Sequence, residues 1–149
     1  MIDKILPKIH NEGYKFVIIF VFVTIILYFV HGFLGFVGIV LSIWCYYFFR
    51  DPERISIQDD NYLVSPADGV VLQILDTNGP KELGLENRKF KKISIFMNVF
   101  DCHVNRSPCA GKISDILYKP GKFINASFDK ASEDNERNYY KIKNNQNED

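Results

Sequence analysis

The chain divides near residue 50 into an apolar part and a polar part. Residues 16–49 contain no Asp, Glu, Lys or Arg, whereas the sequence from Arg50 onward is polar and rich in turn-forming residues. About 20 helical residues cross a bilayer core about 30 Å thick, and one straight helix over the whole apolar stretch would be about 51 Å long. A single crossing with modest tilt cannot take up that length, so the stretch predicts two helices.

The centre of the apolar stretch is the expected break. His31, Gly32 and Gly35 lie there, and glycine beside a polar ring favours a helix end. We therefore expect helices over 14–30 and 33–49, the second ended by an Asp-Pro pair. Lysines precede the stretch and arginines follow it, and positive flanks favour the cytoplasmic side. Both ends should be cytoplasmic; a shallower re-entrant hairpin is the alternative.

Two other interpretations of the apolar stretch are a signal peptide and a buried helix pair in a soluble core. A signal peptide has an apolar region of about 7–15 residues followed by small residues at a cleavage site. The stretch here is more than twice as long and ends in aromatic residues and Arg50. Most of the chain's 13 phenylalanines lie in it, which favours contact with lipid.

The polar part has the pattern of short strands. Apolar runs alternate with turn signals, which is typical of an all-β sandwich or barrel; the runs cover residues 62–64, 70–75, 92–97 and 112–118. The frame S-P-x-x-G-x-[VI]-x-x-I occurs twice, beginning at Ser65 and at Ser107. The expected fold is therefore mainly β: a membrane helical hairpin followed by an incomplete β-sandwich or barrel built from two similar units.

Charge and cysteine content exclude several classes of function. Lys and Arg balance Asp and Glu at 18 each, so net charge gives no case for nucleic-acid binding. Three irregularly spaced cysteines do not make a disulfide framework. Cys102 and Cys109 flank His103, but this spacing matches no common zinc site and no second ligand pair follows, so no metal is expected.

Two short segments carry candidate chemistry. Asp68 lies in a tight turn before a strand, where an aspartate most often bonds to its own backbone. Residues 101–108 group an acid, an imidazole, an amide and a guanidinium. His103 could move protons near neutral pH if a carboxylate orients its ring, and Arg106 suits a carboxylate or phosphate. The alternative is a purely structural histidine.

Two cations, Lys119 and Lys122, lie around a Pro-Gly turn beside Phe123. They form either a solvated loop or a contact with an anionic lipid head group.

Together these segments identify a family. The chain resembles the phosphatidylserine decarboxylases, in the short form of bacteria and archaea. The resemblance covers nearly the whole chain and rests on FFRDPER at 48–54, SPADGVV at 65–71, ISIFMNVFDCHVNRSPCAGKI at 93–113, YKPGKFINASFDKAS at 118–132 and NER at 135–137.

The resemblance implies a mechanism and partners. Such enzymes are made as a precursor that cuts itself at a Gly-Ser bond, and the serine becomes a pyruvoyl group on the small chain. Its carbonyl forms a Schiff base with phosphatidylserine and withdraws electrons as carbon dioxide leaves, giving phosphatidylethanolamine. The implied partners are phosphatidylserine, membrane lipid and the small pyruvoyl-bearing chain, with a homo-oligomer left open. The implied location is a bacterial cell membrane, with the catalytic domain on its cytoplasmic face.

The resemblance also implies roles for individual residues. Asp68 matches an aspartate that helps self-cleavage, and His103 matches an acid/base histidine at the substrate carboxylate. The candidate substrate-binding residues are Arg106, Asn105, Lys119 and Lys122. Arg106 stands where longer members have a second histidine, so the base for cleavage is open: His103 serves both steps, or Asp68 acts without it.

The expected domains are 1–15, a cytoplasmic segment; 16–49, the membrane hairpin; and 50–149, part of the decarboxylase domain. No Gly-Ser dipeptide occurs in the 149 residues, and residues 144–149 look like a turn between strands. We therefore expect a fragment or truncated product that is inactive and poorly folded alone. The alternatives are a membrane-tethered carrier or interaction module, such as a lipoyl or phosphocarrier domain, and an inactive remnant.

Overall fold

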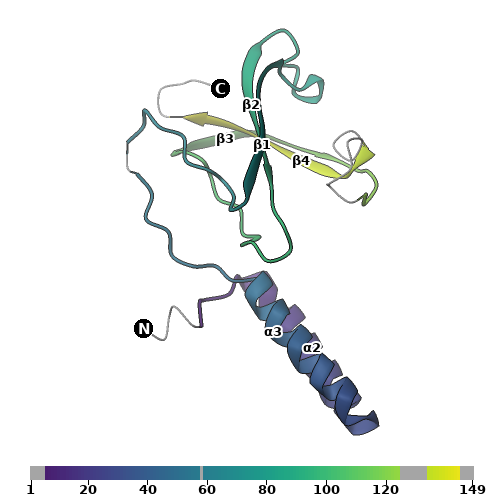
Figure 1. Ribbon diagram of the computed structural model, residues 1–149. Coiled ribbons are helices and arrows are strands. Elements are labelled where there is room, and N and C mark those ends of the chain that lie inside the picture. Colours follow the sequence, from purple (N-terminus) through teal and green to yellow (C-terminus); the bar gives the residue numbers. More distant parts are fainter. Residues whose placement is uncertain (1–5, 58, 125–133, 145–149) are drawn as a thin grey trace. The chain divides into compact units, whose positions relative to one another are not determined.

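The computed structural model describes residues 6–57, 59–124 and 134–144. Two helices, α2 (Asn11–Val30) and α3 (Gly32–Phe48), precede the strands and a single 3₁₀ turn, η1 (Lys81–Leu83) (Figure 1). The four strands are β1 (Val70–Asn78), β2 (Lys89–Phe96), β3 (Gly111–Lys119) and β4 (Arg137–Asn144). They form two small antiparallel sheets, β1–β2 and β3–β4.

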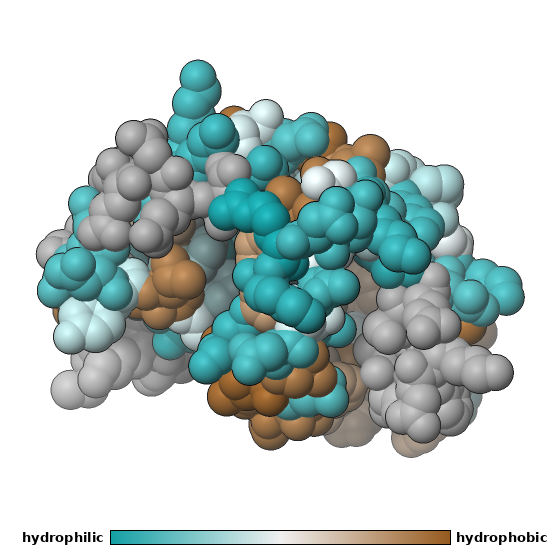
Figure 2. All heavy atoms as spheres, turned by 90° about the horizontal axis from the view of Figure 1, so that it is seen from above, coloured by the Kyte–Doolittle hydropathy of each residue, from teal (hydrophilic) through white to brown (hydrophobic). Residues whose placement is uncertain are grey.

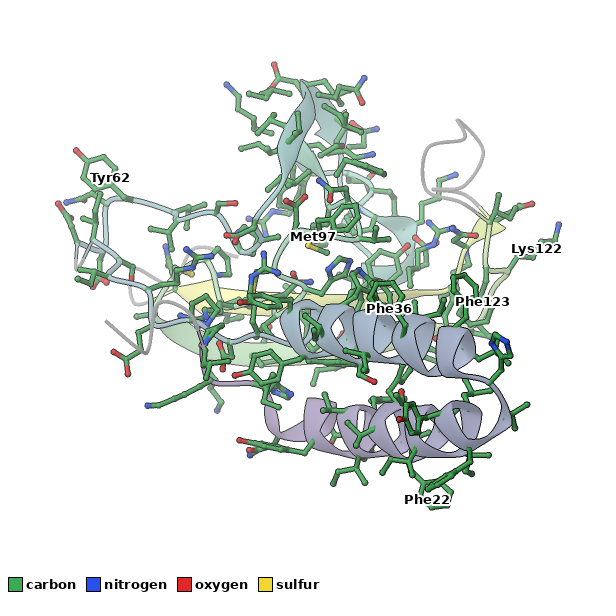
Figure 3. All side chains as sticks on the ribbon, turned by 60° about the horizontal axis from the view of Figure 1, so that its bottom comes forward. Phe22, Phe36, Tyr62, Met97, Lys122 and Phe123 are labelled. Atoms are coloured by element: carbon green, nitrogen blue, oxygen red, sulfur yellow. The ribbon has the colours of Figure 1, made fainter. Side chains whose placement is uncertain are left out.

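The predicted pair of helices is confirmed, with ends that differ by a few residues. α2 and α3 lie side by side (Figures 1 and 3) and are joined by His31 alone. His31 donates its backbone N–H to Leu27 and accepts from the Phe33 N–H through Nδ1 at 3.2 Å. One residue thus closes α2 and caps α3, because its side chain satisfies a free N–H at the start of the second helix.

Small residues let the two helices approach closely. A Cβ added at Gly35 would lie 2.8 Å from the Tyr28 Cα, and one at Gly38 would lie 2.7 Å from Thr24 Oγ1. Thr24 Oγ1 also lies 3.0 Å from Ser42 Oγ, which gives a hydrogen bond between the helices. Such contacts hold helices together in lipid, where burial of apolar side chains adds little.

The outer surface of the hairpin is apolar. Phe22 is 63 % exposed and points away from α3, and Phe36 is 62 % exposed (Figure 3). α2 has 20 residues, contains an 18-residue window with a mean hydropathy of 2.3, and is long and apolar enough to span a membrane, whereas α3 is a shorter apolar helix. The composition is therefore consistent with membrane association.

The N-terminal segment is paired with the chain that leaves α3. Ile9 forms an isolated antiparallel bridge with Arg50, and the Asp51 N–H donates to the Lys8 carbonyl at 2.7 Å. α3 ends at Phe48 rather than at the Asp-Pro pair. The backbone at Arg50 and Asp51 is thus paired with the N-terminal segment instead of continuing the helix.

The two sheets share an irregularity. The β1–β2 register shifts between Val71 and Gln73, and the β3–β4 register shifts between Ile113 and Asp115. Both shifts fall at the same position of the repeated S-P-x-x-G frame. A bulge of this kind adds local twist to a strand pair. Gly69, just before β1, has φ 149°, a conformation that L side chains rarely adopt.

Two predictions for the polar part need correction. Residues 62–64 do not form a strand, although the Val64 N–H donates to the Pro108 carbonyl at 2.9 Å. β4 was not expected. Its sequence, RNYYKIKN, is mostly polar with two adjacent tyrosines, and its partner β3 is distant in sequence, so no short apolar run indicated it. Residues 145–149, within the turn expected at 144–149, lie outside the described residues.

Apolar side chains remain on the surface of the strands. Leu72, Ile74, Ile93 and Ile116 are all more than half exposed, and brown apolar patches lie among the teal polar surface in Figure 2. Two two-stranded sheets are thus the architecture of the described β region, and they leave apolar side chains without cover.

The described residues form two compact units that alternate along the sequence. The hairpin unit contains residues 6–56, 65–69 and 97–106, and the strand unit contains the described parts of 57–64, 70–96 and 107–144. Asp68 and His103 both belong to the hairpin unit, although the strands that follow them belong to the strand unit.

Candidate functional site

The chain that leaves α3 holds the loop that carries the histidine. We call residues 48–54 the exit segment and residues 98–106 the histidine loop; both belong to the hairpin unit. The Cys102 thiol donates to the Arg50 carbonyl at 3.1 Å, and Arg50 Nη2 donates to the Phe100 carbonyl at 2.9 Å. Cys102 is only 3 % exposed. These reciprocal contacts fix the first half of the loop against the exit segment.

His103 is oriented by a ring contact and by a backbone carbonyl. Its imidazole stacks on the Phe48 ring with centroids 4.1 Å apart and an interplanar angle of 26°. Nδ1 lies 3.0 Å from the Asp101 carbonyl oxygen. The expected carboxylate partner is therefore replaced by a carbonyl, because the Asp101 carboxylate instead accepts the Asn98 N–H at 2.9 Å. The tautomer that donates from Nδ1 leaves the lone pair on Nε2, which can then accept a proton.

Arg106 joins three segments of the hairpin unit. Its Nη2 donates to Asp51 Oδ1 at 2.5 Å and to the Pro52 carbonyl at 2.6 Å, and its backbone N–H donates to the Pro66 carbonyl at 2.9 Å. The side chain is 40 % exposed. The residue thus connects the histidine loop both to the exit segment and to the turn that contains Asp68. Its expected contact with substrate stays a prediction.

Asp68 is held by the exit segment as well. Its carboxylate forms an ion pair with the Arg54 guanidinium, and both side chains are a little under half exposed. The Arg54 guanidinium thus restrains the Asp68 carboxylate, while solvent can still reach it. Asp68 and His103 are therefore both attached to one short stretch of chain.

The two lysines expected near a head group lie in the strand unit. Lys119 Nζ pairs with Glu82 Oε1 at 2.8 Å, and Lys122 Nζ pairs with Asp134 Oδ2 at 3.0 Å. The hydrogen bond from Lys119 lowers the pKa of the Glu82 carboxyl to about 2. Asn105 lies in the hairpin unit and is exposed. Binding of substrate by these residues stays a prediction.

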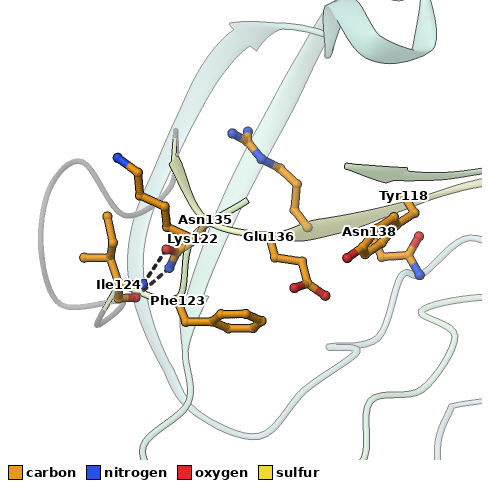
Figure 4. A pocket seen from close by; sticks show the side chains of 8 residues that line it. Tyr118, Lys122, Phe123, Ile124, Asn135, Glu136 and Asn138 are labelled. Atoms are coloured by element: carbon orange, nitrogen blue, oxygen red, sulfur yellow. Dashed lines mark hydrogen bonds between the residues drawn. The ribbon is translucent and has the colours of Figure 1, made fainter. Parts of the chain in front are cut away.

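The strand unit has an open pocket beside Lys122. Its volume is about 590 Å³, and Figure 4 shows Phe123, Glu136 and Tyr118 among its lining residues. Asn135 closes one side: its amide donates to the Ile124 carbonyl at 2.6 Å and its oxygen accepts the Ile124 N–H at 2.7 Å (Figure 4).

Sequence reasoning did not assign Phe48, Arg50, Asp51 or Arg54 to the site. The signal that could have found them is the group of charged residues directly after an apolar stretch. The charged residues of the exit segment contact the histidine loop and the Asp68 turn.

Sequence comparison places these segments among known proteins. The sequence profile of the phosphatidylserine decarboxylase family matches residues 41–149. A phosphatidylserine decarboxylase proenzyme of Pelagibacter ubique is 75 % identical over 144 residues, which cover 97 % of this chain and 67 % of the relative. A proenzyme of the same name from Ruegeria pomeroyi is 54 % identical over 138 residues, 93 % of this chain and 63 % of the relative. The chain thus spans about two thirds of the length of these curated relatives.

Proposed function

Because the chain belongs to the phosphatidylserine decarboxylase family, we propose that it is the membrane-attached part of an enzyme that converts phosphatidylserine to phosphatidylethanolamine. One observation carries the proposal: the exit segment of an apolar hairpin holds both the histidine loop and the Asp68 turn. A substrate that itself resides in a bilayer can reach reacting groups that are held at the end of an apolar hairpin.

The cofactor that the family implies is a pyruvoyl group formed from a serine of the same precursor. It supplies an electron-withdrawing carbonyl beside the bond to the departing carboxyl group. The residues present fit such a group, because His103 Nδ1 is engaged by the Asp101 carbonyl and Nε2 is left for a reacting atom. His103 would act there as the acid or base that moves a proton at Nε2.

Asp68 has the second proposed role, in self-cleavage of the precursor. Arg54 holds its carboxylate, and Arg106 connects its turn to the histidine loop through the Pro66 carbonyl. This arrangement supports a carboxylate that acts near the same place as His103. Either Asp68 acts alone as the helper of cleavage, or His103 takes part in both steps.

Substrate contacts are proposed for Arg106, Asn105, Lys119 and Lys122. Arg106 already donates to Asp51, so it would present its remaining N–H groups to a carboxylate or phosphate. The lysines would exchange their present carboxylate partners for an anionic head group. The proposed location is the cytoplasmic face of a bacterial cell membrane, with the small pyruvoyl-bearing chain of the precursor as partner.

The strand region is proposed to be a sandwich or barrel made of two similar β units. Two sets of contacts support this. Ser65 Oγ donates to the Ala67 carbonyl and Ser107 Oγ to the Cys109 carbonyl, both at 2.7 Å. The backbone bonds are reciprocal: the N–H before each Ser-Pro pair donates to the proline carbonyl of the other pair, at 2.9 Å in both cases.

The test uses a hybrid precursor, which we define as residues 1–149 joined to the Gly-Ser-bearing segment of a family member. We expect the hybrid to cut itself and to form phosphatidylethanolamine in vesicles containing phosphatidylserine, measured by mass spectrometry. His103→Ala should lower product formation by about 100-fold or more, the upper part of the range for proton transfer. The matched control is His31→Asn, which keeps a cap at the hairpin tip. Equal activity of the His103→Ala and His31→Asn enzymes would contradict the proposal.

A further inference from the structure

The last turn of α3 contributes directly to the arrangement of the reacting histidine. We propose that Phe48 is a positioning residue that fixes the plane of the His103 imidazole, so that the end of the hairpin forms one wall of the reaction site. The inference rests on the proposed function and deepens it, because it gives the hairpin a part in the chemistry besides attachment.

The Phe48 and His103 rings are nearly parallel, at 26° and 4.1 Å between centroids. The other contacts of Phe48 are tilted or edge-on: Trp44 at 5.4 Å and 49°, and Phe49 at 5.2 Å and 73°. Phe48 is therefore held by two aromatic neighbours, Trp44 in α3 and Phe49 directly after it, and it presents one face to the imidazole. Stacked aromatic pairs contribute about 0.5–1.5 kcal/mol beyond the area they bury.

A hydrogen bond alone does not fix an imidazole. The contact between His103 Nδ1 and the Asp101 carbonyl restrains one distance, which more than one combination of the two side-chain torsions of His103 can satisfy. Stacking on Phe48 removes this freedom, because only one ring plane keeps the face-to-face contact. Together the two contacts set the direction of Nε2, the nitrogen that is left for proton transfer.

The surroundings explain why the arrangement is stable. Cys102, next to His103, is 3 % exposed and bonded to the Arg50 carbonyl, and Arg50 bonds back to the Phe100 carbonyl. The backbone on both sides of the Phe48–His103 contact is thus tied together. A membrane hairpin that moves as one piece would carry His103 with it at a constant depth.

The first experiment measures the ring contact in the hybrid precursor, purified in detergent micelles. Ring protons over the face of a phenyl group are shifted upfield in the NMR spectrum. We expect an upfield His103 signal that is lost in Phe48→Leu and kept in Phe48→Tyr. The matched control is Phe36→Leu, the same change at an exposed position of the same helix. A His103 signal that is unchanged in Phe48→Leu would overturn the contact.

The second experiment measures catalysis by the processed hybrid enzyme. Misplacement of a catalytic group by about 1 Å can lower the rate about 100-fold, so we expect Phe48→Leu to lower kcat about 10- to 100-fold. KM should change less than about threefold, and Phe48→Tyr should restore kcat to within about threefold. Phe48→Met also removes the ring but keeps an apolar side chain of similar length, and we expect it to lower kcat as Phe48→Leu does. With two such variants, a folding defect in one of them does not decide the result.

The outcomes separate the two proposals. If the unsubstituted hybrid enzyme forms no phosphatidylethanolamine, the proposed function fails, while the NMR comparison still decides whether Phe48 orients His103. If the hybrid is active and kcat is unchanged in both Phe48→Leu and Phe48→Met, the positioning role is wrong and the proposed function stands. A rise in KM with unchanged kcat would also contradict it, because it would indicate a role in binding.

Discussion

The ion pair between Asp51 and Arg106 makes a quantitative prediction about the site. It closes the histidine loop onto the exit segment, at 2.5 Å between Oδ1 and Nη2, and the two side chains are 34 % and 40 % exposed. We expect that removing either charge loosens the loop while leaving the hairpin intact. The perturbations are Asp51→Asn, Arg106→Met and the double variant.

The expected magnitude follows from the exposure of the pair. Fully exposed ion pairs contribute about 0.2–1 kcal/mol, and hydrogen bonds to charged groups about 1.5–3 kcal/mol when water is excluded. The two side chains are about one third to two fifths exposed, so we expect a coupling energy near the top of the range for exposed ion pairs, about 0.5–1 kcal/mol. A coupling of that size changes an opening equilibrium about two- to fivefold, since 1.4 kcal/mol corresponds to a factor of ten.

The assay is hydrogen exchange of the backbone amide at position 106, which donates to the Pro66 carbonyl. Exchange of this amide reports local opening of the loop rather than global unfolding. A double-mutant cycle isolates the coupling from the effects of each substitution alone. The matched control is the cycle for Lys8 and Glu53, an ion pair in the same unit that is more than 80 % exposed. A coupling for Asp51 and Arg106 no larger than for the control pair would refute the reasoning.

Three further predictions concern other parts of the chain. Gly35→Leu should force α2 and α3 apart, because its Cβ would lie 2.8 Å from the Tyr28 backbone. We expect the free energy of unfolding to fall by about 1–3 kcal/mol, measured by thermal unfolding in micelles. An unchanged unfolding midpoint would contradict this. The lowered pKa of Glu82, about 2 against an ordinary 4.5, means that its pairing with Lys119 stabilises the fold above pH 4.5 and stops doing so as pH falls toward 2. Denaturant unfolding at a series of pH values should therefore show that the Glu82→Gln variant loses less stability between pH 4.5 and 2 than the unsubstituted protein does. The same loss in both proteins would rule out this role of Glu82. Asn135→Ala removes two part-buried hydrogen bonds to the neighbouring backbone and should cost about 1–3 kcal/mol in the same unfolding assay, whereas a change below 0.5 kcal/mol would show that water replaces them.

The hairpin could be predicted from sequence because its causes are local. The length of the apolar stretch sets the number of helices, and His31 with its neighbouring glycine sets the break. The position of β4 could not be predicted in the same way. Its sequence, RNYYKIKN, shows no regular alternation of apolar and polar residues, and residues 120–136 separate it from its partner β3, too many for a tight hairpin turn to indicate the pairing.

Only some of the candidate site residues could be predicted from the sequence. His103 stands in an unusual cluster of polar residues, whereas Asp68 reads as an ordinary turn aspartate and was selected only because its motif matches the family. The residues that hold them were not visible, because Phe48 and Arg54 reach their partners through folding and not through spacing. The group that orients His103 was not visible for the same reason: whether Asp101 offers its side chain or its carbonyl depends on the turn it caps.

We propose that this chain supplies the aspartate and the histidine of a self-processing lipid decarboxylase. The most direct measurement is a time course of the hybrid precursor with phosphatidylserine labelled at its carboxyl group, following the cleaved chains by gel and the released carbon dioxide by counting. We predict that Asp68→Asn leaves the precursor uncut and that His103→Ala releases almost no labelled carbon dioxide. Normal cleavage in Asp68→Asn together with normal release in His103→Ala would contradict the account.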